Sequence, residues 1–123
     1  MKSLEIEMPA GWRIFGELLD VNPDTLSDAD LVVLTEDILQ IQSPDGSFMM
    51  DVSWLPDSDR QGNYVCRVIL YDNWEAPIEL FETRETREAY FWIQRCFTKL
   101  ENLEKARIVG RLKWGDLKQK NEI

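Results

Sequence analysis

The sequence predicts an α+β domain: an antiparallel, meander-like sheet of about five strands, covered on one face by a long C-terminal helix. Three observations support this prediction. Segments with alternating apolar residues fill much of residues 12–82, a Ser-Pro-Asp-Gly turn separates two of them, and a helical apolar repeat occupies residues 83–107. One covered face leaves the opposite face of the sheet open to solvent or to a partner.

The N-terminal third predicts one strand between irregular segments. Residues 1–10 are expected to be a lead-in. The first strand is expected over residues 12–21, with a short helix over residues 16–20 as the competing interpretation. Residues 22–30 combine an Asn-Pro-Asp turn with a polar loop that has room for one helical turn. A short apolar run follows at residues 31–34.

The middle of the chain predicts an antiparallel hairpin. Residues 37–42 alternate apolar and polar side chains, and the turn at residues 43–46 has Pro at its first central position and Gly after it. The alternation over residues 47–55 is the clearest in the chain. It places four large apolar side chains on one side: Phe48, Met50, Val52 and Trp54.

Two more strands are expected after this hairpin. A polar loop at residues 56–63 leads to a strand over residues 64–71 that is rich in Val, Ile and Tyr. A connection at residues 72–77 then leads to a short strand over residues 78–82. The helix follows this strand directly, so the chain order is strands first and one long helix last.

Residues 83–107 have the apolar spacing of an amphipathic helix. The apolar residues recur at steps of three and four: Ala89, Trp92, Ile93, Cys96, Phe97, Leu100 and Leu103. Thr83 is the expected N-cap, because its hydroxyl can accept a hydrogen bond from a backbone N–H one turn further on. Residues 108–114 are expected to form a last strand or a docked extension, and residues 116–123 to fray. Residues 1–123 then make a single domain.

Charge is distributed unevenly along the chain, whose net charge is −9. Residues 1–104, here called the acidic body, hold 8 basic and 21 acidic side chains, a net charge of −13. Residues 105–123 hold 6 basic and 2 acidic side chains, a net charge of +4. We expect no binding to nucleic acid, because the acidic body repels phosphates.

No apolar run is long enough for a transmembrane helix, and the N-terminus has no apolar signal segment, so no membrane partner and a cytoplasmic location are expected. Cys66 and Cys96 fall in a predicted strand and on the apolar stripe of the helix. In a reducing compartment both are expected to be buried thiols rather than a disulfide.

The absence of histidine from the sequence excludes nucleophilic triads and zinc sites that depend on it. No phosphate-binding or dinucleotide-binding glycine motif and no EF-hand spacing is present. We therefore expect no cofactor, no metal and no enzymatic activity. Six irregularly spaced carboxylates between residues 20 and 37 are interpreted as surface charge rather than a cation site. A carboxylate-based enzyme or small-ligand binder is kept as a third hypothesis.

Acidic and aromatic residues around the hairpin and the next strand form the candidate contact surface. They are Asp51, Asp57, Asp59, Asp72, Trp74 and Glu75. Tryptophan is favoured at interfaces because it buries a large area with few torsions to freeze. A carboxylate patch speeds association with a basic protein and sets its specificity. The alternative interpretation is that these carboxylates serve solubility and protect a sheet edge.

Residues 45–94 resemble small acidic bacterial proteins that act as immunity partners of secreted toxins. The similarity lies in a succession of features: an alternating strand with a W-x-P-D exit at residues 54–57, a polar loop, a Val/Ile strand, an N-W-E-x-P connection at residues 73–77, a short strand and an amphipathic helix. The resemblance implies an inert protein that binds one toxin and covers its active site with acidic and aromatic residues. Basic nucleases are among such toxins, and the acidic body suits them.

The leading hypothesis is therefore a non-enzymatic binding module, an immunity-type inhibitor of a basic partner protein such as a toxin. The alternative is a small homodimeric structural or regulatory protein. In that case the open sheet face or residues 108–114 would pair across a two-fold axis.

Overall fold

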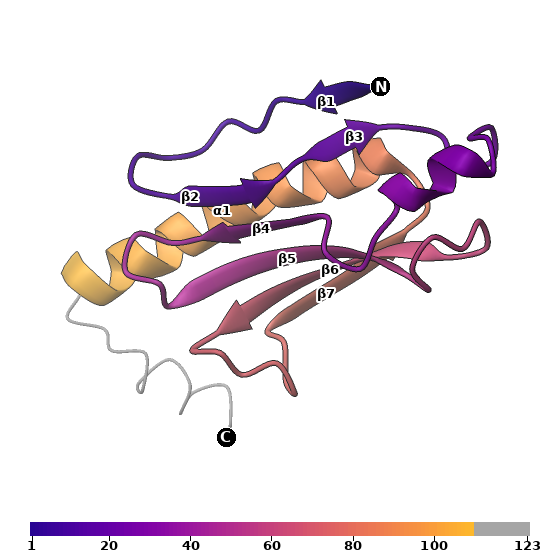
Figure 1. The fold of residues 1–123 in the computed structure, drawn as a ribbon. Coiled ribbons are helices and arrows are strands. Elements are labelled where there is room, and N and C mark those ends of the chain that lie inside the picture. Colours follow the sequence, from indigo (N-terminus) through magenta and orange to yellow (C-terminus); the bar gives the residue numbers. More distant parts are fainter. Residues whose placement is uncertain (110–123) are drawn as a thin grey trace.

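The protein folds as an antiparallel sheet with one long helix packed across it, as the computed structural model of residues 1–109 shows (Figure 1). In spatial order the strands of the five-stranded sheet are β2 (Arg13–Gly16), β4 (Leu39–Gln42), β5 (Phe48–Leu55), β6 (Asn63–Leu70) and β7 (Glu79–Thr83). All neighbouring pairs are antiparallel. Helix α1 (Thr86–Val109) follows β7 directly. The predicted α+β architecture is confirmed.

The core lies between α1 and one face of the sheet. The four alternating side chains predicted on one side of β5 are fully buried: Phe48, Met50, Val52 and Trp54. Six of the apolar helix residues are buried with them: Ala89, Trp92, Ile93, Cys96, Phe97 and Leu100. Leu103 is half-buried at the edge of this core. Each large apolar side chain buried in this way contributes about 1.5–3 kcal/mol, which holds the helix on the sheet.

The prediction of Thr83 as N-cap is wrong. Thr83 remains in β7, paired with Tyr64 of β6, and the helix begins three residues later at Thr86. The Thr83 hydroxyl accepts a hydrogen bond from the Glu85 N–H (3.0 Å) and donates one to the Glu88 carboxylate. Through these two hydrogen bonds Thr83 stabilises the turn between strand and helix. The N-cap prediction fails because the β6–β7 ladder extends one residue further than predicted.

The prediction of one strand over residues 12–21 is also wrong, as is the competing helix. β2 ends at Gly16, and the chain leaves the sheet as β3 (Leu18–Asp20), which pairs with β1 (Lys2–Leu4) in a two-stranded ribbon. Gly16 adopts a φ of +91°, and a Cβ at this position would lie 2.2 Å from the Ile38 carbonyl oxygen. The break is set by this close approach of the backbone before β4, which no local pattern reveals.

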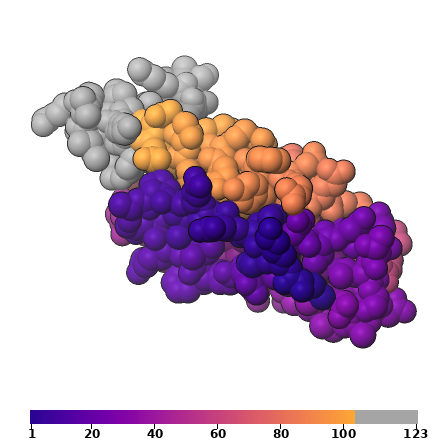
Figure 2. Space-filling view, turned by 90° about the horizontal axis from the view of Figure 1, so that it is seen from above, coloured from indigo at the N-terminus to yellow at the C-terminus, as the bar shows by residue number. Residues whose placement is uncertain are grey.

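The N-terminal segment is not a lead-in but covers one flank of α1, beside the helix in Figure 2. The Glu7 N–H donates to Gln94 Oε1 (3.1 Å), and Gln94 Nε2 donates back to the Glu7 carbonyl (3.0 Å). Further along, the rings of Trp12 and Phe97 meet edge to face with centroids 5.1 Å apart. These contacts join segments more than 80 residues apart, so sequence patterns could not indicate them.

The remaining predictions differ from the structure in smaller ways. The apolar run at residues 31–34 lies mostly in a short 3₁₀ helix, η1 (Ala29–Val33). The β4–β5 turn forms where the sequence predicts it, closed by a hydrogen bond from the Gly46 N–H to the Ser43 carbonyl (2.9 Å). Ile108 and Val109 belong to α1, not to a last strand. Residues 110–114 and the predicted frayed segment 116–123 lie outside the described residues.

Both cysteines are free, buried thiols, as predicted. Burial raises the pKa of Cys66 and of Cys96 to about 12, so both are protonated at neutral pH. In the described part of the chain, no helix has the length and apolar character needed to cross a membrane.

Candidate functional site

The predicted contact residues lie in three separate places on the sheet. β5 and β6 are eight residues each and antiparallel, so the loops at their two ends are about 26 Å apart. The β5–β6 loop at one end carries Asp57 and Asp59, and the β6–β7 loop at the other end carries Asp72, Trp74 and Glu75 (Figure 1). Asp51 lies between them, on the sheet face opposite α1. These residues therefore do not form one continuous patch.

The β6–β7 loop (residues 71–78) displays aromatic and acidic side chains together. Tyr71 and Trp74 are 53% and 44% exposed. The side chains of Asp72 and Glu75 are exposed as well, and neither makes an ion pair or a hydrogen bond with another described side chain. The loop therefore offers two aromatic rings and two carboxylates to a partner.

The backbone of this loop is held in an unusual conformation. Tyr71 and Asp72 have positive φ angles of 51° and 58°, which cost about 1–3 kcal/mol per residue outside glycine. Three backbone hydrogen bonds join the loop to residues outside it: the Tyr71 N–H to Ser47 (2.9 Å), the Asn73 N–H to Leu70 (3.1 Å) and the Ile78 N–H to Val68 (2.9 Å). Two more lie within the loop. Strain of this kind is concentrated at functional sites, where surrounding contacts maintain it.

At the opposite end of the sheet, Asp57 and Asp59 are used within the β5–β6 loop. Asp57 accepts hydrogen bonds from the Ser58 hydroxyl (2.7 Å) and from the Glu36 N–H (3.0 Å), and both lower the pKa of its carboxyl. Asp59 accepts from the Gln61 N–H (2.9 Å) through its carboxylate and from the Trp54 indole through its carbonyl (2.7 Å). The hydrogen bonds of these two residues therefore hold the conformation of the β5–β6 loop.

Asp51 is 3% exposed, although nothing in its sequence context indicates burial. Its carboxylate accepts hydrogen bonds from Gln40 Nε2 (3.2 Å) and the Ser53 hydroxyl (3.0 Å), and Arg67 lies 3.7 Å away. Asp51, Gln40 and Arg67 belong to a row of paired residues that crosses all five strands: Phe15, Gln40, Asp51, Arg67 and Leu80. The side chains at the two ends of the row, Phe15 and Leu80, are exposed. The open face thus has an exposed apolar side chain at each end of this row and a hydrogen-bonded polar centre.

The environment of Asp51 leads to a pH prediction. Burial raises the pKa of the Asp51 carboxyl, although hydrogen bonds from Gln40 and Ser53 and the charge of Arg67 oppose the rise. Because the folded protein then holds this proton more tightly than the unfolded chain, stability falls as pH rises through the folded pKa. We expect the free energy of unfolding of the wild type to decrease relative to that of Asp51→Asn as pH rises above the ordinary value of 3.8.

Urea unfolding of both chains between about pH 3.5 and about pH 7 measures this difference. The lowered pKa of Asp57 also makes stability depend on pH, but this contribution is the same in both chains and cancels in the difference. A difference that stays constant, or that shifts in favour of the wild type as pH rises, would contradict the assignment of Asp51 as a carboxylate disfavoured by burial.

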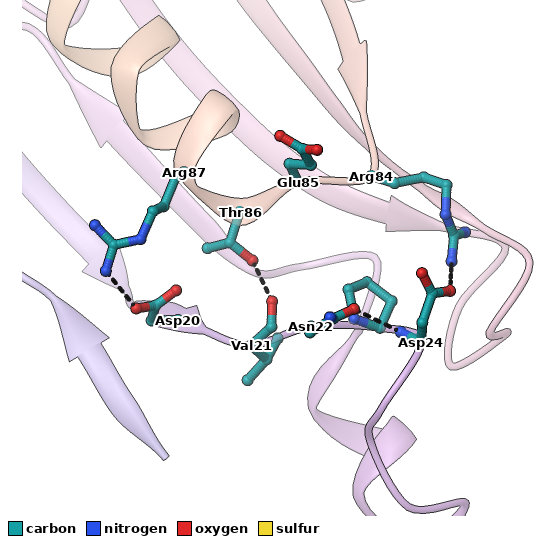
Figure 3. Close-up of a pocket in the computed structure, with 9 residues that line it drawn as sticks. Asp20, Val21, Asn22, Asp24, Arg84, Glu85, Thr86 and Arg87 are labelled. Carbon is teal, nitrogen blue, oxygen red and sulfur yellow. Dashed lines mark hydrogen bonds and ion pairs between the residues drawn. The ribbon is translucent and has the colours of Figure 1, made fainter.

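An open pocket of about 510 Å³ lies where the β3 exit meets the start of α1 (Figure 3). Two ion pairs of 2.8 Å cross it, Arg84 with Asp24 and Arg87 with Asp20. The Thr86 hydroxyl donates to the Val21 carbonyl (3.0 Å) and accepts from the Tyr64 hydroxyl (2.7 Å). The arginines are already paired, and these contacts fasten the N-terminal part of the chain to the helix start.

The acidic residues between positions 20 and 37 are partly neutralised by arginines far away in sequence. Asp28 pairs with Arg60 (2.8 Å), in addition to the two pairs across the pocket. Among the side chains that the structure describes, no group of three or more potential metal-ligating carboxylates or thiols is placed to hold an ion. The sequence could not reveal these pairs, because their members are 32–67 residues apart.

No family model, curated protein or solved structure matches this chain. Its function is therefore inferred from the geometry of the described residues.

Proposed function

We propose that this protein is a non-enzymatic binding module, an immunity-type inhibitor, that holds a basic partner protein such as a toxin through its β6–β7 loop. One observation carries the proposal. The loop exposes Tyr71 and Trp74 beside Asp72 and Glu75, which pair with no other described side chain, on a backbone kept in a strained conformation. A bacterial origin and a cytoplasmic location, where such an inhibitor protects its cell, belong to the same proposal.

Aromatic and acidic groups have different tasks in this proposal. A tryptophan that becomes buried on binding is a frequent hot spot, because it fills a pocket with little loss of side-chain freedom. Carboxylates around such an anchor steer a basic partner and raise the association rate, and the net charge of −13 on the acidic body adds to this field. The fixed backbone reduces the entropy lost on binding.

The other predicted contact residues have smaller direct parts in this proposal. Asp57 and Asp59 shape the β5–β6 loop and add to the negative field of the molecule. Asp51 is too buried for its carboxylate to meet a partner directly. It instead keeps Gln40 and Arg67 in place on the open face.

Charge reversal in the loop tests the proposal. Tagged wild-type protein is used to capture the partner from lysate of the native cell, and a salt gradient elutes it for mass spectrometry. We expect Asp72→Lys with Glu75→Lys to raise the Kd of the complex by about tenfold, mainly through slower association, and to reduce its salt dependence.

The matched control is Glu36→Lys with Asp37→Lys, which makes the same charge change on exposed residues at the opposite end of the sheet. Equal weakening by both double variants would show that net charge, not the loop, drives binding. Unchanged affinity of the loop variant would remove the loop from the contact surface.

A homodimer is a second candidate, favoured by the open face of the sheet. Phe15 and Leu80 are exposed there, and Arg13 and Arg67 offset the charges of Asp51 and Glu82. Asp37, beside Phe15, adds one negative charge at the edge of this face. A face with little net charge is the one on which two copies of an acidic chain repel each other least. Capture that returns only the bait, together with a dimer mass in light scattering, would favour this candidate.

A further inference from the structure

A groove of about 530 Å³ lies between the N-terminal segment and α1. It is on the flank of the helix away from β7, which instead contacts α1 through the stacked rings of Phe81 and Trp92 and the ion pair of Glu79 with Lys99. In Figure 2 the N-terminal segment lies along the helix, so the two walls of the groove come from opposite ends of the described chain. The groove is thus separate from the β6–β7 loop.

The walls of the groove are held in place by contacts already described. Gln94 lies in the groove and bonds the Glu7 backbone through both its oxygen and its nitrogen. Met8 packs against the core, and Phe97 meets Trp12 edge to face. A ligand would therefore enter a preformed site, with little ordering of the protein on binding.

The lining of the groove combines aromatic rings with carboxylates. Phe91 is 54% exposed, and its ring lies edge to face with that of Tyr90, with centroids 5.4 Å apart. Glu7 and Glu101 also line the groove, and neither forms an ion pair with another described side chain. None of the described lining residues is basic. Aromatic faces and carboxylates both attract an organic cation, and a guanidinium can use both at once.

We propose that this groove binds an arginine side chain, flanked by apolar residues, on a segment of another protein. The guanidinium would lie over Phe91 and Tyr90 and pair with Glu101 or Glu7, while the flanking apolar groups would contact Met8. This site does not depend on the function proposed for the β6–β7 loop, because the two surfaces share no residue.

The charge distribution disfavours the described surface of a second copy as the source of this cation. The acidic body holds 8 basic residues, and Arg60, Arg67, Arg84, Arg87 and Lys99 each pair with a carboxylate of the same chain. Arg13 donates a hydrogen bond to Gln42 (3.1 Å). Lys2 and Arg95 are exposed and make no ion pair with a described side chain, but two copies of an acidic body with a net charge of −13 repel each other. A different, basic protein is therefore the better match for Glu7 and Glu101, which pair with no described side chain.

Binding of a short peptide to the full chain tests the proposal. The probe is the acetylated, amidated pentapeptide Ala-Leu-Arg-Leu-Ala, followed by NMR shifts of backbone amides. The matched peptide replaces arginine with citrulline, which has nearly the same shape but no charge. We expect shifts at Glu7, Phe91 and Glu101, and a Kd about fivefold higher for the citrulline peptide. Phe91→Ala and Glu101→Gln should each weaken binding of the arginine peptide by a similar factor.

The control variant is Glu85→Gln, which removes one charge just before the first residue of α1, away from the groove. Equal binding of the two peptides, or equal weakening by Glu85→Gln and Glu101→Gln, would overturn the proposal in favour of diffuse electrostatic attraction. The full-length double variant Arg111→Gln, Lys113→Gln gives a further test. If it bound the arginine peptide at least tenfold more tightly than the wild type, the proposal would be overturned, because the groove would then be assigned to the chain's own basic C-terminal residues. Since the assay contains no partner protein, its failure would leave the role of the β6–β7 loop untouched.

Discussion

Replacing Trp74 with alanine is expected to raise the Kd of the complex with the basic partner by thirtyfold or more, which corresponds to about 2 kcal/mol. Trp74 is 44% exposed, and its indole N–H makes no hydrogen bond within the described chain. The free protein therefore loses little when the ring is removed. In a complex the same ring would bury apolar area and find a partner for its N–H.

Two measurements separate this binding effect from damage to the fold. The free energy of unfolding of Trp74→Ala should stay within about 0.5 kcal/mol of the wild type, as is usual for exposed positions. Phe15→Ala removes a 54% exposed aromatic ring from the open sheet face and is the matched control. Loss of affinity in Phe15→Ala with normal affinity in Trp74→Ala would place the partner on the open face instead.

Gly16→Ala is expected to destabilise the protein by about 3 kcal/mol or more. The φ of +91° disfavours any residue with a Cβ, and the added carbon would lie 2.2 Å from the Ile38 carbonyl oxygen. Relief of this clash requires β2 and the backbone before β4 to separate, which weakens the pairing of Gly16 with Leu39. Urea unfolding measures the loss.

Gly46→Ala is the matched control for this prediction. Gly46 also has a positive φ, of 77°, but no atom lies within 4 Å of the position that its Cβ would take. Its substitution should therefore cost only the conformational penalty of about 1–2 kcal/mol. Equal destabilisation by the two alanine variants would show that the contact with Ile38 contributes nothing to the break between β2 and β3.

Elements that depend on near neighbours in the chain were predictable. The helix and the β4–β5 hairpin are examples, because periodicity and turn residues are local properties, and the apolar residues on one side of β5 and along α1 form the observed core. The position of Trp74 in a polar connection between two strands was likewise accessible, since loops lie at the surface.

The sequence by itself thus determined the α+β class, the helix, the middle strands and the acidic, histidine-free chemistry of the chain. Only the tertiary structure decided how the predicted contact residues are distributed. Strand length places Asp57 and Asp72 at opposite ends of the sheet, and cross-strand neighbours bury Asp51. The tertiary structure also decided the break at Gly16 and the attachment of the N-terminal segment to Gln94. Each of these features depends on atoms brought together from distant positions in the chain, which local periodicity does not encode.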